Sequence, residues 1–72
     1  MTARQKVLAK HPKAYCFIGV QETPFGEWKS GDRFYFILER GQGSDRFLSE
    51  HKKAQTFFRS AHDAWQSAAS LL

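Results

Sequence analysis

The C-terminal segment, residues 60–72, most constrains the fold, because one of its sides is apolar and needs another surface to cover it. Ser60, followed three residues later by Asp63, is typical of a helix start, because both side chains can bond to free N–H groups of the first turn. We therefore expect a helix here, with small residues that let a neighbouring element approach closely and cover its one tryptophan. The apolar side chains recur at the three- and four-residue spacing of a helix face: Ala61, Ala64, Trp65, Ala68 and Leu72.

The chain has 72 residues, which predicts a single domain, 1–72, with a small core. A core of this size rarely supplies more than ~3–5 kcal/mol without a covalent or metal link. Cys16 is the only cysteine, so a disulfide within one chain is excluded. Aromatic residues make up 15% of the chain, and each one buries roughly 150–250 Å² in a core. We therefore expect aromatic packing, self-association or both to complete the stability.

Three further elements are predicted before the C-terminal helix. Thr2 and Gln5 have the spacing of a capping box for a short N-terminal helix. That helix should end just before Pro12, because the residue preceding a proline is pushed out of the helical region. Residues 14–21 and 33–40 alternate as strands do, and together they predict an antiparallel hairpin.

The connection between the two predicted strands, residues 22–32, is long for a hairpin and carries Phe25 and Trp28. Both rings contribute most when buried, so we expect this loop to be packed down by its own side chains. The sequence thus predicts an α+β fold: a small antiparallel sheet of two or three strands, a short N-terminal helix, and a C-terminal amphipathic helix packed on one sheet face. The residues expected in its core are Leu8, Ile18, Phe34, Phe36, Trp65 and Leu72.

Residues 46–59 leave two alternatives open, a helix or a third strand. Apolar side chains step by four and three through this segment, and no glycine or proline occurs after Gly43, which favours a helix. Against a helix, residues 46–48 could pair with the strand at 33–40, and residues 56–58 are rich in strand-forming side chains. Of the two alternatives, we favour the helix.

Residues 6–14 and 60–69 carry two short motifs, KVLAKHPKA and SAHDAWQSAA. The pair resembles small uncharacterised proteins of tailed phages and prophages. Those proteins run from a helix through His-Pro-x-Ala into strands, and they close with a serine-started helix that contains Ala-Trp and Ala-Ala. Before that last helix they have a glycine-containing strand, where this chain has residues 52–59 without glycine. The resemblance implies a phage or prophage origin and supplies no mechanism.

If residues 46–59 form a third strand, the element order becomes helix, three strands, helix. That order is similar to the topology of a double-stranded RNA-binding domain. Such domains place lysines at the start of their last helix, where they contact phosphates across a groove. Here that position holds Ala61, His62 and Asp63, so the likeness carries no RNA-binding function over to this chain.

No residue pattern predicts an enzyme, a metal site or a cofactor. Cys16 lies in an apolar strand, where a cysteine is usually a small buried hydrophobe and not a nucleophile paired with a histidine. The three histidines and Cys16 lack the short paired spacing of a structural zinc site. Gly41 and Gly43 follow a strand, but Arg46 stands where a dinucleotide-binding loop has its third glycine, so we expect a tight turn.

The net charge of +4 and the isoelectric point of about 9.6 mildly favour an anionic partner. Basic residues collect in residues 1–13 and 46–59, on either side of a slightly acidic middle. If the two segments are neighbours in the fold, they could bind nucleic acid, with exposed rings stacking on bases. Otherwise they are a solvated face. The candidate contacts for a partner or for nucleic acid are Arg4, Lys6, Arg46, Lys52, Lys53, Arg59, Phe25, Trp28 and Phe57.

No apolar run approaches the roughly 18 residues that span a bilayer, and no apolar leader opens the chain. With one unpaired cysteine, we expect a protein of the cytoplasm of a bacterial host cell. The function we favour is a non-enzymatic accessory protein of phage or prophage origin that acts by protein–protein contact, either with a host protein or with its own copy. The alternative is a nucleic-acid-binding module that uses the two basic segments. Neither a membrane nor a small-molecule substrate is expected as a partner.

Overall fold

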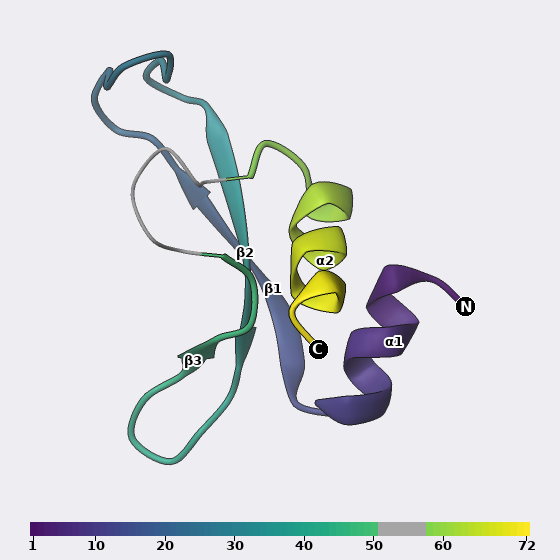
Figure 1. Ribbon diagram of the computed structural model, residues 1–72. Helices are drawn as coiled ribbons and strands as arrows, with labels where there is room; N and C mark the ends of the chain where they lie inside the picture. The colour runs from purple at the N-terminus through teal and green to yellow at the C-terminus, as the bar shows by residue number, and fades with distance from the viewer. Residues whose placement is uncertain (51–57) are drawn as a thin grey trace.

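The computed structural model describes residues 1–50 and 58–72, and it shows the expected α+β fold (Figure 1). A short helix comes first, three antiparallel strands follow, and a second helix closes the chain. The order is therefore the one expected from the third-strand alternative. The elements are α1 (Ala3–Lys10), β1 (Ala14–Val20), β2 (Arg33–Glu39), β3 (Arg46–Phe47) and α2 (Ala61–Ser70).

Both helices begin at the predicted capping residues. The Thr2 Oγ1 accepts a hydrogen bond from the Gln5 N–H at 3.1 Å, and the Gln5 Oε1 accepts one from the Thr2 N–H at 2.9 Å, so the capping box of α1 is confirmed. Ser60 is the N-cap of α2, and its Oγ accepts from the Asp63 N–H at 3.1 Å. These bonds satisfy N–H groups that have no partner within the helix, and so they fix where each helix starts.

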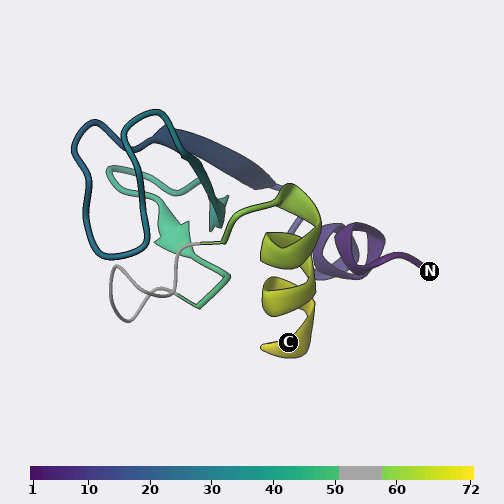
Figure 2. The same cartoon turned by 90° about the horizontal axis from the view of Figure 1, so that it is seen from above.

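The sheet has the strand order β1-β2-β3. β1 pairs with β2 along its whole length, from Ala14 opposite Glu39 to Val20 opposite Arg33. β3 adds only two pairs on the other side of β2. Both helices lie on the same side of the sheet, with α2 next to the strands and α1 beyond it (Figures 1 and 2). The fold is thus a two-layer arrangement with one helix-covered sheet face.

The core lies between α2 and the helix-covered face of the sheet. Ile37 of β2, Val7 of α1 and the alanines Ala64 and Ala68 of α2 form its buried cluster. Trp65 is half-buried and packs against this cluster. Because the alanine side chains are small, α2 can pack closely against β2. This agrees with the prediction that small residues let a neighbouring element approach the helix.

Several of the expected core residues lie elsewhere. Phe36 is buried, and Leu8 and Phe34 are half-buried. The prediction is wrong for Ile18 and Leu72, which are 57% and 47% exposed. Ile18 lies on β1, whereas α2 packs mainly over β2, so the helix layer leaves that side chain uncovered. Leu72 lies beyond the C-cap of α2, Leu71, so the helix does not hold its side chain against the sheet.

The favoured helix over residues 46–59 is wrong for the described part of that segment. Residues 46–47 form β3, the N–H groups of Leu48 and Ser49 donate to the Ile37 carbonyl, and the Phe58 carbonyl accepts from the Tyr35 N–H. The physical reason is the second edge of β2, whose buried peptide groups need partners that a helix could not supply. Residues 51–57 lie outside the described residues, so the prediction is untested for them.

The other sheet face carries a cluster of aromatic rings. The ring of Phe36 lies 6.5, 5.6 and 5.3 Å, between centroids, from those of Phe17, Phe34 and Phe47. The rings of Trp28 and Phe34 pack at right angles, with 6.5 Å between their centroids. The loop 22–32 is therefore packed down through Trp28, as predicted. Phe25 is exposed, contrary to expectation, because the loop turns at this point and only its peptide groups pair with those of Trp28.

Gly19 gives a first stability prediction, because the ring of Phe34 lies directly over it. A Cβ added at Gly19 would overlap Cζ of the Phe34 ring, far inside contact distance. The Phe34 ring is held by Phe36 and Trp28, so it cannot move away freely. We expect Gly19→Ala to lower the free energy of unfolding by about 1–3 kcal/mol, measured by urea titration with tryptophan fluorescence.

A double-mutant cycle supplies the control for Gly19→Ala. In a Phe34→Leu background the smaller side chain leaves room for the new methyl group, so the cost of Gly19→Ala should fall well below its cost in the wild type. An equal cost in the two backgrounds would show that the close approach of the ring is not what requires glycine here.

Candidate functional site

Two of the candidate basic residues are held in contacts within the chain. Nη2 of Arg46 lies 2.5 Å from Oε1 of Glu39. Nη1 of Arg59 lies 3.5 Å from Oδ2 of Asp32, and its guanidinium lies over the ring of Trp28 at 4.0 Å from the centroid. Both side chains therefore already serve the fold by neutralising a carboxylate, and Arg59 also covers a buried ring.

The other described basic candidates, Arg4 and Lys6, lie on α1 beside α2. The Arg4 guanidinium is 6.0 Å from the centroid of the Trp65 ring. Both side chains line a shallow pocket between the two helices, together with His62 and Trp65. The pocket combines cationic groups with an aromatic face, which is a combination that suits an anionic ligand carrying a planar ring.

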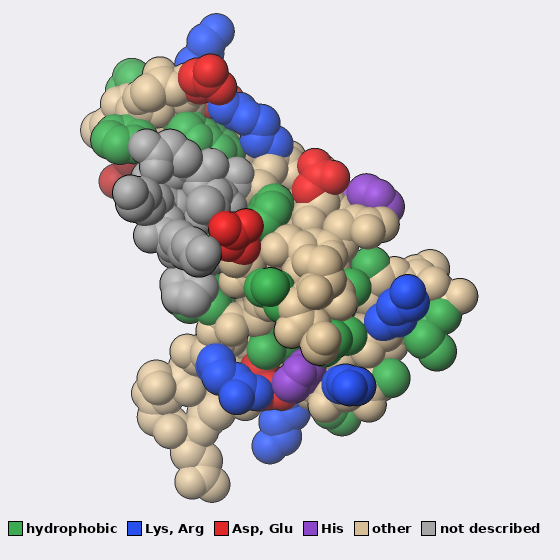
Figure 3. Space-filling view, viewed as in Figure 1, with side chains coloured by type: hydrophobic (Ala, Val, Ile, Leu, Met, Phe, Trp, Pro, Cys, Tyr) green, Lys and Arg blue, Asp and Glu red, His purple; other side chains and the backbone are tan. Residues whose placement is uncertain are grey.

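The basic candidates do not gather into one surface among the described residues. β3, with Arg46, and the first turn of α1, with Arg4, lie on opposite sides of α2 in Figure 1. Figure 3 shows Lys and Arg side chains at separated positions on this face, with acidic groups between some of them. Lys52, Lys53 and Phe57 lie outside the described residues. The described basic residues are therefore spread around the fold.

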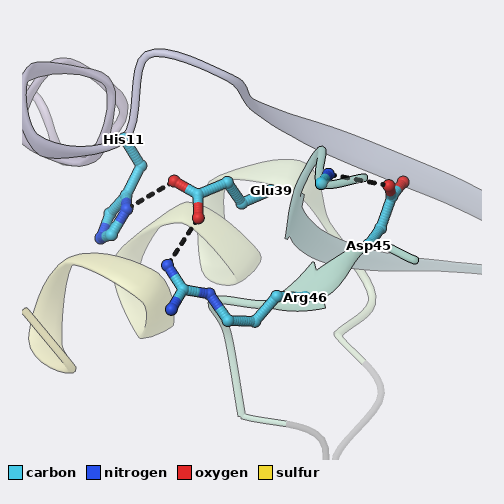
Figure 4. Close-up of polar contacts among 5 residues, drawn as sticks. His11, Glu39, Asp45 and Arg46 are labelled. Atoms are coloured by element: carbon cyan, nitrogen blue, oxygen red, sulfur yellow. Dashed lines mark hydrogen bonds and ion pairs between the residues drawn. The ribbon is translucent and has the colours of Figure 1, made fainter. Parts of the chain in front are cut away.

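Sequence analysis missed a polar cluster that joins α1 to the sheet (Figure 4). The Glu39 carboxylate accepts from Nδ1–H of His11 at 2.7 Å and from the Arg46 guanidinium at 2.5 Å. Next to it, Asp45 accepts from the Gly41 N–H at 3.4 Å and from the Tyr15 hydroxyl. His11 and Glu39 are 28 residues apart, so no local spacing could have shown that they meet.

The cluster has an electrostatic signature at Glu39. The hydrogen bond from His11, and then the hydrogen bond and charge of Arg46, lower the pKa of the Glu39 carboxyl below its ordinary value of 4.5, although partial burial opposes them. A hydrogen-bond donor on each oxygen favours the ionised form. The carboxylate is thus occupied by its two partners, which makes the cluster a clamp between the end of α1, β2 and β3.

This clamp predicts a pH dependence of stability. Because folding lowers the pKa of Glu39, its contribution is complete above pH 4.5 and is lost as the pH falls below that value towards the pKa of the folded state. We expect the wild type to lose stability over this range relative to Glu39→Gln, which cannot titrate. Urea midpoints at pH 6 and at lower pH test this. The exposed Glu22→Gln variant should keep the wild-type pH profile.

Cys16 and the glycine turn show no sign of chemistry. Cys16 is half-buried in β1, and burial raises the pKa of its thiol, which opposes a reactive thiolate. The connection from β2 to β3 bends at residues 42–44, and Gly43 has φ +91°, a backbone conformation that favours glycine. In the part of the chain that the structure describes, no three His, Cys, Asp or Glu side chains are placed to hold a metal ion.

The most distinctive feature of the surface is the edge strand β1, whose exposed apolar side chains lie on both sheet faces: Phe17 on the aromatic face, Ile18 and Val20 on the helix-covered face. Phe17, Ile18 and Val20 are 43%, 57% and 56% exposed. They belong to a seven-residue strand, Ala14–Val20, that contains no charged residue and no proline. Such strands are normally blunted at a sheet edge by charge, proline or shortness, because their free peptide groups invite another strand. Sequence analysis missed this surface because it assigned Ile18 to the core.

Comparison with known proteins adds no relative to this description. No protein-family model, no curated protein and no solved structure matches the chain. Among the described residues, no helix has the length and apolar character needed to cross a membrane. The fold and the site therefore define the class to which the chain can be assigned: a small α+β domain with one apolar edge strand.

Proposed function

We propose that this chain is a non-enzymatic binding protein that acts by protein–protein contact through β1. The observation that carries the proposal is the exposure of Phe17, Ile18 and Val20 on an uncharged edge strand. An exposed apolar surface combined with free peptide groups suits the addition of a protein strand, because main-chain bonds supply affinity and side chains supply selectivity. A strand edge that contacted only water would not benefit from exposed apolar side chains or from the absence of charge.

The two terminal motifs support a more specific form of the same proposal. Residues 6–14 and 60–69 resemble small proteins of tailed phages and prophages, so we propose an accessory role of phage or prophage origin in the cytoplasm of a bacterial host. The partner in this proposal is either a host protein or a second copy of this chain.

A site-specific photo-crosslinking experiment tests the proposal. A photoreactive phenylalanine analogue is placed at Val20, and a matched probe is placed at Leu71, which is 62% exposed and is the C-cap of α2. We expect the Val20 probe to give a discrete crosslinked protein product in bacterial cells producing the chain, and the Leu71 probe to give none. If the Val20 probe yields no protein product, or both probes yield the same set, the proposed contact through β1 is wrong.

Nucleic-acid binding is the second candidate, and the pocket between α1 and α2 is the observation that favours it. Arg4, Lys6 and the Trp65 ring lie together there. For this candidate we expect binding of short single-stranded or duplex RNA to weaken with salt, and Arg4→Glu to weaken it further and lower the salt slope by about 1. Trp fluorescence titrations measure both effects. An RNA affinity that does not change with salt concentration, or an Arg4→Glu variant with the wild-type affinity, would contradict nucleic-acid binding at this pocket.

A further inference from the structure

The outer edge of β1 has free main-chain groups, as the hydrogen-bond pattern shows. Next to the two ends of β1, the Arg40 N–H donates to the Lys13 carbonyl, and the Gln21 N–H donates to the Asp32 carbonyl. In an antiparallel ladder the bonded residues alternate, so the odd-numbered residues of β1 bond to β2. The peptide groups of Cys16, Ile18 and Val20 therefore point away from β2.

No described strand lies on that outer side, where β1 forms the upper border of the sheet in Figure 2. The opposite side of β2 differs, because β3, Ser49 and Phe58 bond to its outward peptide groups. One edge of the sheet is thus closed by the chain itself. At the other edge the Ala14 N–H donates to the His11 carbonyl at 2.9 Å, and the outward peptide groups of Cys16, Ile18 and Val20 face no described strand.

From this geometry we infer that β1 pairs with β1 of a second copy of the chain, in an antiparallel dimer whose two three-stranded sheets become one sheet of six strands. The inference rests on the proposed function and names the partner of the same site. A two-fold axis would make the contact identical for both copies, which is the commonest arrangement of a homodimer.

The register of this dimer follows from the strand itself. Cys16, Ile18 and Val20 must bond to residues of the same parity, and all seven residues lie opposite a residue of the second β1 only if Phe17 faces Phe17. In the outermost pair only the Ala14 carbonyl is available, because the Ala14 N–H donates to the His11 carbonyl. Cys16 then faces Ile18, Tyr15 faces Gly19, and Ala14 faces Val20. Each of these last three pairs sets a small side chain against a larger one, and the two Phe17 rings meet where cross-strand side chains lie closest.

The strand's lack of charge favours a second copy over a different protein. With no charged side chain, the strand offers no charge pattern by which a different partner would be selected, whereas its order of small and large residues complements itself. The small buried cluster of Val7, Ile37, Ala64 and Ala68 also fits a chain that gains stability by association. Pairing would also partly cover Phe17, Ile18 and Val20, three of its large exposed hydrophobic side chains, with the side chains of the second strand.

The first test is the solution mass of the purified full chain, by sedimentation velocity from low to high micromolar concentration. We expect a concentration-dependent rise from 8.3 kDa to twice that mass. Ile18→Lys adds a charge at an exposed edge position and should abolish the dimer while the circular dichroism spectrum stays that of the wild type. Leu71→Lys makes the matched change at an exposed site off the edge and should remain dimeric.

A disulfide test then reports the register without relying on Ile18→Lys. In a Cys16→Ser background, Phe17→Cys should form a crosslinked dimer on mild oxidation, because the two new thiols face each other across the axis. Val20→Cys should not form a crosslinked dimer, because position 20 of the second copy lies six residues further along the strand, about 20 Å away. Equal crosslinking of the two variants would overturn the inferred pairing.

The failure of this inference can be separated from that of the proposed function. A monomer at every concentration, or a dimer that survives Ile18→Lys, would overturn pairing between copies through β1. If the Val20 photo-probe nevertheless captured one defined protein other than this chain, protein–protein contact through β1 would stand. If it captured nothing, both would fall.

Discussion

Replacing Ile37 with alanine is expected to lower the free energy of unfolding by about 2–5 kcal/mol, because the side chain is fully buried and the space it leaves cannot be refilled easily. Ile37 is the centre of the cluster that joins Val7 of α1 to Ala64 and Ala68 of α2. Alanines cannot extend into the gap. For a domain with so small a core, this loss is large enough to leave much of the protein unfolded at ordinary temperature.

The matched control is Ile18→Ala, which removes the same atoms from the neighbouring strand. Ile18 is 57% exposed, so its replacement should change the stability of the single chain by about 0.5 kcal/mol or less. Urea titrations at the lowest practical concentration keep any association out of the comparison. Similar losses for the two variants would mean that the core does not lie where the structure places it.

Replacing Ser49 with alanine is the second large effect, expected to cost about 1–3 kcal/mol because it leaves a buried N–H group without an acceptor. Ser49 is only 2% exposed, and its Oγ accepts from the Ile37 N–H at 3.0 Å. In a regular strand pair a backbone carbonyl would take this bond. Here a hydroxyl replaces it, because the chain leaves β2 after the two residues of β3.

Ser70→Ala is the control for Ser49→Ala. The Ser70 hydroxyl donates to the Ser67 carbonyl on the exposed end of α2, where water can replace the lost bond. We expect a change of about 0.5 kcal/mol or less there, measured in the same thermal or urea unfolding experiment. A Ser49→Ala variant as stable as Ser70→Ala would show that water or a local shift supplies the Ile37 N–H with another partner.

The elements with local signals could be predicted from the sequence. The capping residues Thr2 and Ser60 lie within three residues of the groups they bind, and strand alternation is visible within each strand. These signals gave the α+β class and the placement of both helices. They also placed Trp28 in the packed part of its loop, since a large ring in a small domain contributes most when it is buried.

Long-range features could not be predicted in the same way. The periodic apolar pattern of residues 46–59 suits a helix when the segment is considered alone, but the second edge of β2 needs hydrogen-bond partners, and that need exists only after the hairpin has formed. Glu39 likewise meets His11 and Arg46 only through the sheet. Ile18 was placed in the core because the pattern shows which residues share a strand face, and not how far a helix extends over it.

The unequal edges of the sheet limit how many copies could join. Towards β3, the outward peptide groups of β2 are satisfied by a two-residue strand, a serine hydroxyl and the carbonyl of Phe58. A long open strand is present only at β1 among the described elements. Because the described sheet has one long open edge strand, strand pairing would use up that edge in each copy. Association would therefore stop at a dimer and would not continue into a fibre.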